Sequence, residues 1–264
     1  MLNKGLQMSL WGVFMPKMDR SSMIYMSEPF FLFICAAPLC GAGPINPNQT
    51  NKRKYKSLHR VGPHNIDVLS VMFGCLLGDA YAEKRSDSTR ICFQQESNNV
   101  EYLRGLHKFF AERLYTNPSK PVLQKRIGPK GSTRFVCRFK TWSFQSLNWL
   151  HDTFYITENG VKCKRVPSLE HLNTFCTPIA RAVWIMDDGT KSGKGLTLAT
   201  NSFPEKDVQV RSLFLKTKYG LQNRVNRCGK ENQYVIYIWA ESMPTRISVV
   251  RLYMIEGMLY KLGI

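Results

Sequence analysis

Acidic residues are scarce in this chain of 264 residues, which carries 19 Asp and Glu against 37 Lys and Arg. The formal net charge is +18, and the isoelectric point lies near 9.7. An excess of one sign is unfavourable for a compact domain on its own, because like charges repel one another. The composition therefore predicts a polyanionic partner, either a nucleic acid or an anionic membrane surface.

The sequence also lacks a long hydrophobic run, although its hydrophobic fraction of 44% is that of a globular protein. The longest apolar stretch, Pro29–Leu39, is too short for the roughly 20 residues that a membrane-spanning helix needs. We therefore expect nucleic acid, and no membrane, as the partner.

Metal-binding cysteine patterns are absent as well. None of the eight cysteines forms a CxxC pair or a Cys/His cluster with zinc spacing. Most lie within apolar or alternating segments, which is typical of small buried thiols in a reducing compartment. We expect neither disulfides nor a structural zinc ion.

The first 60 residues differ in composition from the rest. Residues 1–40 are rich in methionine and aromatic residues, and Gly41–Asn65 is rich in Gly, Pro, Asn and Lys. A signal-like segment, an organelle-directing leader and translated upstream sequence stay open as interpretations. We expect residues 1–60 to form a leader or basic arm and the folded core to begin near Ile66.

The remainder of the chain repeats itself. Apolar helices are predicted over Asn65–Leu77 and Thr177–Met186, and they lead into Asp79 and Asp188, which lie 109 positions apart. Each is followed by a strand, an amphipathic helix, a strand pair and a closing helix. These elements are predicted over Arg90–Gln95, Val100–Tyr115, Val122–Arg126, Thr133–Lys140 and Phe144–Phe154, and again over Leu196–Asn201, Lys206–Tyr219, Gln222–Asn226, Gln233–Ala240 and Arg246–Leu259.

We therefore expect a mixed α/β fold of the α+β class, with two pseudo-symmetric subdomains of order αββαββα at residues 61–165 and 166–264. Small residues at Ser70, Gly74 and Gly78 share one face of the first helix. Glycine inside a helix costs about 1 kcal/mol relative to alanine, so the stripe indicates close approach of the second helix, which offers Ala180 and Ala182. An ordinary buried helix is the alternative.

Both helices lead into an aspartate, although the negative end of a helix dipole disfavours a carboxylate there. If the helices pack side by side, Asp79 and Asp188 emerge together and repel each other unless a cation lies between them. Oxygen-only ligation suits Mg²⁺, which takes one or two carboxylates with water and phosphate oxygens. Such a site activates water and stabilises the leaving oxygen of a phosphodiester. The alternative is a pair of turn aspartates that only cap loops.

The same residues resemble a known family. Phe73-Gly-Cys-Leu-Leu-Gly-Asp-Ala-Tyr and Ala182-Val-Trp-Ile-Met-Asp-Asp-Gly-Thr resemble the two copies of the LAGLIDADG motif. The resemblance is to the single-chain homing endonucleases encoded by group I introns of mitochondria and chloroplasts. Further similar strings are Lys164-Arg-Val-Pro, Leu172, Thr177-Pro178, Thr200-Asn-Ser-Phe and Met258-Leu-Tyr-Lys-Leu. The resemblance covers roughly residues 60–264, and two motifs at this spacing are far more specific than one.

The resemblance implies that the last acid of each motif, Asp79 and Asp188, is catalytic and a metal ligand. Asp187 matches the non-catalytic position, so its side chain is expected to cap or pack. The backbone carbonyls of Gly78 and Asp187 are expected to reach the metal ion. The implied cofactor is Mg²⁺ or Mn²⁺, with Ca²⁺ binding without supporting cleavage.

Two lysines, Lys164 and Lys261, match the periphery of the family's active site. Each is expected to orient water or to offset charge on the scissile phosphate, with solvated phosphate contacts or plain surface charge as alternatives. The chain departs from the motif at Ala80, where glycine is usual, and at Leu77, where many members have an acid. Both positions lie outside the metal-binding one, so activity is still expected.

The strand Thr133–Lys140 supports DNA binding independently. Alternation predicts Phe135, Cys137 and Phe139 on one face, and Arg134, Val136, Arg138 and Lys140 on the other. A face without acids can enter a major groove, where arginine reads guanine edges. Gln94 and Asn201 are expected near the metal-bound water network. The full set of predicted DNA contacts is Lys84, Arg85, Gln94, Lys125, Arg126, Arg134, Arg138, Lys140, Lys191, Asn201, Arg224, Asn226 and Arg227.

These observations predict a monomeric, site-specific DNA endonuclease, and the resemblance implies that it belongs to the mitochondrion, or to the chloroplast, and promotes intron homing. The resemblance implies that it hydrolyses both strands of a long asymmetric site, one strand per aspartate, with short 3′ overhangs. The alternative is an RNA-binding maturase that assists splicing of its host intron. A structural DNA-binding protein without catalysis is a third possibility, and it leaves the paired acids unexplained.

Overall fold

The computed structural model describes residues 62–128, 131–229 and 232–264, and these belong to one compact unit of the chain. The predicted leader at residues 1–60 lies outside the described part. Four of the six cysteines in the described part (Cys75, Cys92, Cys137 and Cys176) are buried, as the apolar surroundings of the thiols predict.

The first half begins with α1 (Ile66–Leu77), which starts where the Asn65 side chain accepts a hydrogen bond from the Asp67 backbone N–H at 2.7 Å. A four-stranded antiparallel sheet follows, in the order β1-β2-β4-β3. The remaining elements of this half are β1 (Tyr81–Arg85), β2 (Ser88–Glu96), α2 (Val100–Glu112), β3 (Leu123–Ile127), β4 (Thr133–Lys140) and α3 (Asn148–Phe154).

The second half repeats this order. Its sheet is also antiparallel, in the order β7-β8-β10-β9. Its elements are α5 (Pro178–Asp188), β7 (Gly189–Ser192), β8 (Gly195–Ala199), α6 (Glu205–Tyr219), β9 (Asn223–Arg227), β10 (Tyr234–Ile238) and α7 (Met243–Val250). The predicted mixed α/β fold, with two repeated halves, is confirmed.

Several features differ from the predicted elements, and strands β1 and β7 had no predicted range. A hairpin of β5 (Tyr155–Glu158) and β6 (Val161–Lys164), followed by α4 (Leu169–Phe175), joins the halves and was not predicted. The single closing helix predicted over Arg246–Leu259 was wrong. Helix α7 ends at Val250, and 3-10 turns at Arg251–Tyr253 and Glu256–Leu262 follow. Extended backbone at Met254 and Ile255 separates the two turns, and such turns give an apolar spacing close to that of a helix.

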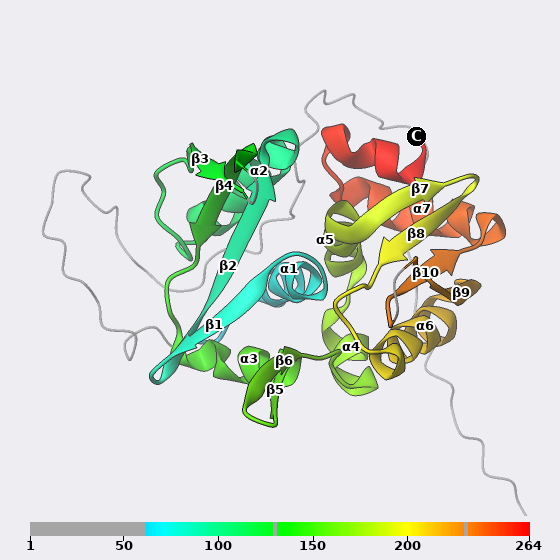
Figure 1. Ribbon diagram of the computed structural model, residues 1–264, viewed down its shortest axis with the longest axis horizontal. Coiled ribbons are helices and arrows are strands. Elements are labelled where there is room, and N and C mark those ends of the chain that lie inside the picture. The colour runs from blue at the N-terminus through cyan, green and yellow to red at the C-terminus, as the bar shows by residue number, and fades with distance from the viewer. Residues whose placement is uncertain (1–61, 129–130, 230–231) are drawn as a thin grey trace, which may run out of the picture. The chain divides into compact units, whose positions relative to one another are not determined.

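The helices α1 and α5 lie side by side between the two sheets (Figure 1). Gly74 allows this approach: a Cβ at that position would lie 2.3 Å from the backbone oxygen of Ala180. Both residues are buried, as are Ala182 and the large side chains of Phe73 and Trp184. The small-residue stripe is therefore a helix contact, and the core continues from it into both halves.

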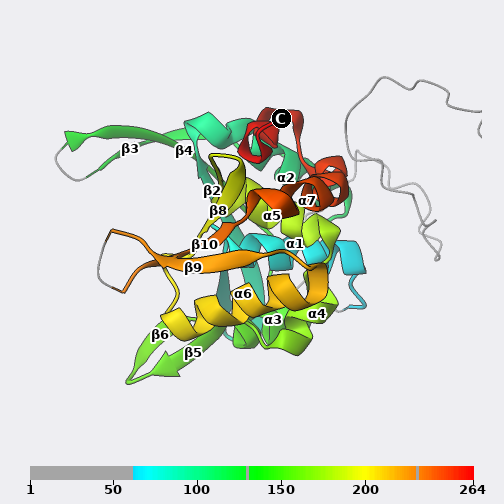
Figure 2. The same cartoon turned by 90° about the vertical axis from the view of Figure 1, so that its right-hand side faces the viewer.

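The strand ends reach toward one side of the protein. In Figure 2, the β3–β4, β5–β6 and β9–β10 hairpins extend to the left, whereas α4 and α7 lie further to the right. Within the described residues, no helix is long and apolar enough to span a membrane.

Candidate active site and nucleic-acid interface

The predicted acids converge where α1 and α5 end. Asp79 follows Gly78, the C-cap residue of α1, whereas Asp188 is the last residue of α5. Asp79 is exposed, and Asp187 and Asp188 are partly buried. A Cβ at Gly78 would lie 2.5 Å from the Cβ of Asp187. Glycine at this position therefore leaves the space that the Asp187 side chain occupies against the other helix.

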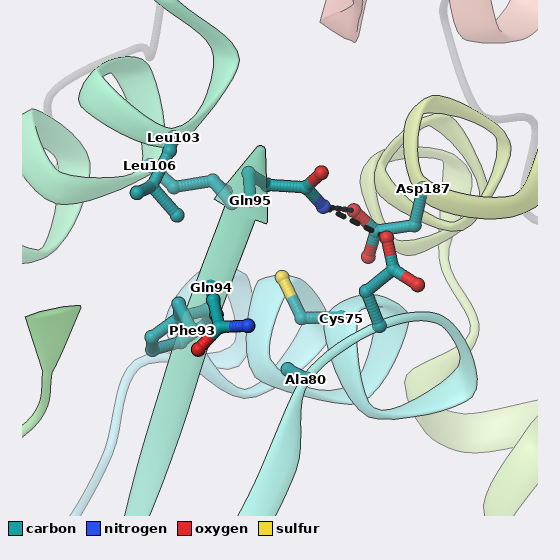
Figure 3. A pocket seen from close by; sticks show the side chains of 9 residues that line it. Cys75, Ala80, Phe93, Gln94, Gln95, Leu103, Leu106 and Asp187 are labelled. Carbon is teal, nitrogen blue, oxygen red and sulfur yellow. Dashed lines mark hydrogen bonds between the residues drawn. The ribbon is translucent and has the colours of Figure 1, made fainter. Parts of the chain in front are cut away.

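A buried glutamine joins the two halves of the acid cluster. Gln95, at the end of β2, donates from Nε2 to Asp79 Oδ2 at 2.8 Å and to Asp187 Oδ1 at 3.3 Å (Figure 3). The sequence pattern pointed to Gln94, which is exposed and makes no such bond. Because successive strand residues face opposite sides, only one of the two glutamines can face the acids, and the structure selects Gln95.

The same bond revises the expectation for Asp187. Its side chain does pack, against Gly78, but it also shares one donor with Asp79 and belongs to the acid cluster. Sequence reasoning missed Gln95 because the spacing of two adjacent glutamines gives no sign of which one turns inward.

The two predicted lysines reach the helix ends from different elements. Lys164, at the end of β6, donates to the backbone oxygens of Gly78 and Ala80, both at 3.0 Å. Lys261, in the last 3-10 turn, donates to the oxygens of Asp187, at 3.0 Å, and Met186. Each ammonium thus lies against carbonyls at the negative end of one helix, where positive charge is favoured.

Burial shifts the pKa values of these groups. Desolvation raises the pKa of Asp187 well above its usual range, and the charges of Asp79 and Asp188 add to the shift. Desolvation and Asp79 raise the pKa of Asp188 to about 7. Desolvation lowers the pKa of Lys164 to about 8, and it also lowers that of Lys261. The acids therefore disfavour ionisation unless a cation compensates them.

The donor set fits a divalent cation such as Mg²⁺. Carboxylates and backbone carbonyls are oxygen ligands, and two carbonyls at the helix ends retain a second lone pair beside their lysine donors. Among the described residues no group of three or more His, Cys, Asp or Glu side chains has the geometry to hold a metal ion. An ion here would take its remaining ligands from water and a phosphate, as Mg²⁺ commonly does.

The raised pKa of Asp188 has a consequence for stability. The folded-state pKa of this carboxyl, about 7, exceeds its ordinary value of 3.8. As the pH rises between these values the unfolded chain ionises while the folded carboxyl keeps its proton, so the folded state loses stability. In metal-free protein we expect Asp188→Asn to be more stable than the parent at pH 8, by on the order of 1 to 3 kcal/mol. The difference should vanish near pH 4, and melting temperatures in chelator across this range measure it.

Asp152 provides a matched control of opposite sign. Its hydrogen bonds with His151 and Lys84 lower its pKa, so Asp152→Asn should melt slightly below the parent at pH 8. Equal pH dependence of the parent and Asp188→Asn would contradict the expected effect.

The predicted DNA-contact residues lie on the strands and on the turns after them. All are exposed except Asn226, which is partly buried. Some are engaged within the chain: Lys84 pairs with Asp152 at 3.0 Å, Arg85 with Glu83 at 2.6 Å, and Arg134 with Glu96 at 3.5 Å. Exposed pairs of this kind contribute little to stability, so a phosphate can compete for these cations.

Strand β4 departs from its predicted alternation near the hairpin. Cys137 and Phe139 are buried and Arg134, Arg138 and Lys140 are exposed, as predicted. Phe135, however, is exposed and Val136 is buried. The apolar pattern could not show this, because Val136 pairs with Glu96, the residue before the turn that precedes α2, and this turn contacts β4 from a distant part of the sequence.

Comparison with known proteins decides the family. Residues 69–245 match the LAGLIDADG DNA endonuclease family. The chain belongs to that family. The match includes both helix-end acids, Asp79 and Asp188, all of α5 and α1 from residue 69 onward.

The curated relatives carry two kinds of name. The chain is 43% identical over 224 residues to the cytochrome b mRNA maturase bI2 of Saccharomyces cerevisiae, an alignment that covers 83% of this chain and 52% of the relative. The chain thus spans about half the length of that relative. It is 40% identical to the maturase bI2 of Debaryomyces hansenii, over 76% of this chain and 75% of that one. It is 36% identical to the intron-encoded endonuclease ai4 of Dictyostelium discoideum, over 60% of this chain and 99% of that one.

A solved structure supports the same fold. The homing endonuclease I-WcaI bound to its DNA recognition sequence matches 83% of this chain and 94% of its own, with a TM-score of 0.66 and 24% identity. The described residues therefore have the LAGLIDADG endonuclease fold.

Proposed function

We propose that this chain is a site-specific DNA endonuclease that hydrolyses both strands of a long, asymmetric double-stranded site with a divalent metal ion. The observation that carries the proposal is the convergence of Asp79 and Asp188 at the ends of two closely packed helices. A buried glutamine contacts Asp79 there, and one lysine lies against each helix end.

In this mechanism, Asp79 and Asp188 would hold Mg²⁺ or Mn²⁺, together with the carbonyls of Gly78 and Asp187. A divalent ion bound there would supply Lewis-acid activation of water and stabilisation of the leaving 3′ oxygen. The Lys164 ammonium, with a pKa of about 8, is mainly charged at pH 7, so it can offset charge on the scissile phosphate. Lys261 has the same role at the other helix end.

The exposed cations of the strands bind the DNA. Three of these cations are exposed on sheet strands, Arg138 and Lys140 on β4 and Arg224 on β9. In the proposed complex they reach base edges or phosphates. Lys84, Arg85, Gln94, Lys125, Arg126, Arg134, Lys191, Asn201, Asn226 and Arg227 complete the proposed contact set.

One chain supplies both halves of the site, so a monomer is sufficient for activity. Because the two halves differ, the DNA target need not be symmetric. The subdomain boundaries proposed from the sequence, 61–165 and 166–264, place the β5–β6 hairpin in the first half. Two relatives are named as cytochrome b mRNA maturases, and on that basis the mitochondrion is the proposed location.

Cleavage of a target library in Mg²⁺, with sequencing of the cut ends, tests the proposal. It should yield one long preferred site with a short 3′ overhang. An absence of cut ends with Mg²⁺ and with Mn²⁺, for a protein that still binds DNA, would refute nuclease activity.

An RNA-binding maturase is the second candidate, and the names of two relatives at 43% and 40% identity favour it. Splicing of the host intron by purified protein, without a cut in the intronless target, would make it the better description. Both activities on one scaffold would appear as splicing and cleavage with the same preparation.

Gln95 provides a sharper test of the site than the acids alone. Gln95→Met keeps the length of the side chain but removes the donor to Asp79 and Asp187, and we expect cleavage about tenfold or more slower with DNA binding retained. Gln209→Met is the matched control, since Gln209 is exposed on α6 and lies outside the proposed contact set. It should cut at nearly the parent rate, and a loss at Gln209 as large as the loss at Gln95 would contradict the assignment.

A further inference from the structure

A buried arginine behind the second acid is not explained by the fold. Arg211, on α6, has no exposed surface. Its Nη2 donates to the backbone oxygen of Leu77 at 3.2 Å, and its guanidinium lies 3.8 Å from the ring centre of Phe203 and 5.1 Å from that of Trp184. Within the described residues its Nε and Nη1 have no hydrogen-bond partner.

An arrangement of this kind is costly. A buried charge without a paired carboxylate loses its hydration, and each unmet donor adds to the cost. The neighbouring acid on the same helix, Asp207, pairs instead with Arg165 at 2.9 Å. The acids that interact with Arg211 through their charge are Asp188 and Asp207, and of these only Asp188 has no cation paired with it among the described residues.

The internal repeat shows what Arg211 replaces. Asp79 and Asp188 occupy equivalent positions, and the strand registers then make Gln95 equivalent to Thr200. The buried residues of α2 and α6 follow at matching spacing, so that Leu106 corresponds to Arg211.

The two acids therefore have different surroundings. Beside Asp79 lies a small, open pocket lined by Cys75, Gln95 and Leu106, and the Gln95 amide donates to the acid (Figure 3). In the second half, Thr200 donates to the backbone oxygen of Tyr234 at 2.6 Å and not to an acid.

Arg211 and Trp184 stand in that half where the first has Leu106 and Cys75. The second half has thus lost the amide donor to its acid and gained a buried cation. Leu106 lines the space beside Asp79, so a side chain at the equivalent position is placed to act on Asp188.

We propose that Arg211 is a positioning residue for Asp188, which holds that carboxylate in place from behind, as Gln95 does for Asp79 through its amide. The effect on cleavage rests on the proposed nuclease function, with one strand served by each aspartate. The cation is fixed by Leu77 at the end of α1, so it also ties the second acid to the first helix.

Strand-resolved cleavage of the preferred site tests this role in the full chain. For Arg211→Met we expect the strand served by Asp188 to be cut about tenfold or more slowly, with the other strand changed far less and DNA affinity unchanged. Asp188→Asn identifies which strand that is. Arg211→Lys should restore much of the lost rate, because it keeps a cation at this place.

Arg181 offers a matched control. It is another buried arginine, on α5, stacked 3.5 Å from the ring centre of Tyr219 and with an unpaired Nε, and its charge interacts with Tyr219 and Cys176 rather than with the acids. Arg181→Met should leave the ratio of the two strand rates unchanged. Equal slowing of both strands by Arg211→Met, or no slowing, would overturn the proposal.

Crystal structures of the parent, Arg211→Met and Arg211→Lys proteins provide a readout that needs no activity. The Asp188 carboxylate should be displaced in Arg211→Met and kept in Arg211→Lys, with Asp79 unmoved in both. An unmoved Asp188 in Arg211→Met would refute the positioning role even in an inactive protein. Failure of the parent to cut DNA would count against the nuclease function alone.

Discussion

Replacing either Asp79 or Asp188 by asparagine is expected to abolish double-strand cleavage while DNA binding persists. Asparagine keeps the shape of the side chain but removes the charge that a divalent ion requires. We expect linear product to form at least about a thousandfold more slowly, measured on a supercoiled plasmid with the preferred site, together with unchanged affinity in Ca²⁺.

Two further variants show whether the loss of cleavage is specific to Asp79 and Asp188. Asp187→Asn tests the choice within the doublet. Asp187 packs against Gly78, so its variant should lose about tenfold or less if Asp188 is the ligand. Asp87→Asn changes an exposed acid in the turn between β1 and β2, and it should cut at the parent rate. If both motif variants cut as fast as the parent in Mg²⁺, the mechanism is wrong.

Gly74→Ala is expected to be the most damaging small substitution in the fold. A Cβ at Gly74 would lie 2.3 Å from the Ala180 backbone oxygen, and backbone on both helices must move to relieve the overlap. Overpacking of this kind costs about 3 kcal/mol, which lowers the melting temperature by at least about 5 °C for a protein of this size. Cleavage should fall as well, because the acids lie at the ends of the same two helices.

Gly105→Ala is the matched control for that prediction. Gly105 also lies inside a helix, α2, but its added Cβ would meet only the Ile255 side chain at 3.8 Å. Alanine favours the helix by up to about 1 kcal/mol, so this variant should melt at or slightly above the parent temperature. A Gly74→Ala protein as stable as Gly105→Ala would show that the helices can separate without cost.

Much of the fold followed from patterns within short segments. The apolar stripes of α1 and α5 and the alternation of β4 are local signals, and each predicted its element. Elements whose form depends on distant contacts were missed. The β5–β6 hairpin has no distinct periodicity, and its ends are held by Tyr155, which accepts from the Ala82 N–H, and by Lys164, which donates to Gly78 and Ala80. The last 3-10 turn after α7 contacts α2 and β7, which are distant in the sequence.

The candidate site also has a part that the sequence predicted and a part that depends on distant contacts. The identity of Asp79 and Asp188 as the acids of interest, the two lysines and the strongly basic strands depended on residue types and on a repeat 109 positions long. These features are visible in the amino-acid sequence alone. They predicted where chemistry gathers, because a duplicated helix with an acid at its end places both acids together once the helices pack.

Only the tertiary structure decided which neighbours act on those acids. Strand alternation allows either Gln94 or Gln95, and the docking of β2 beside α1 turns Gln95 inward. Asp187 fills the space over Gly78 because α5 approaches α1 closely at that glycine. The sequence alone would suggest that Arg211 is one more surface cation in a basic chain, yet the packing of α6 buries it, and it interacts with Asp188 through its charge. Residue type and spacing thus determined the acids, whereas the register between helices and sheets determined what surrounds them.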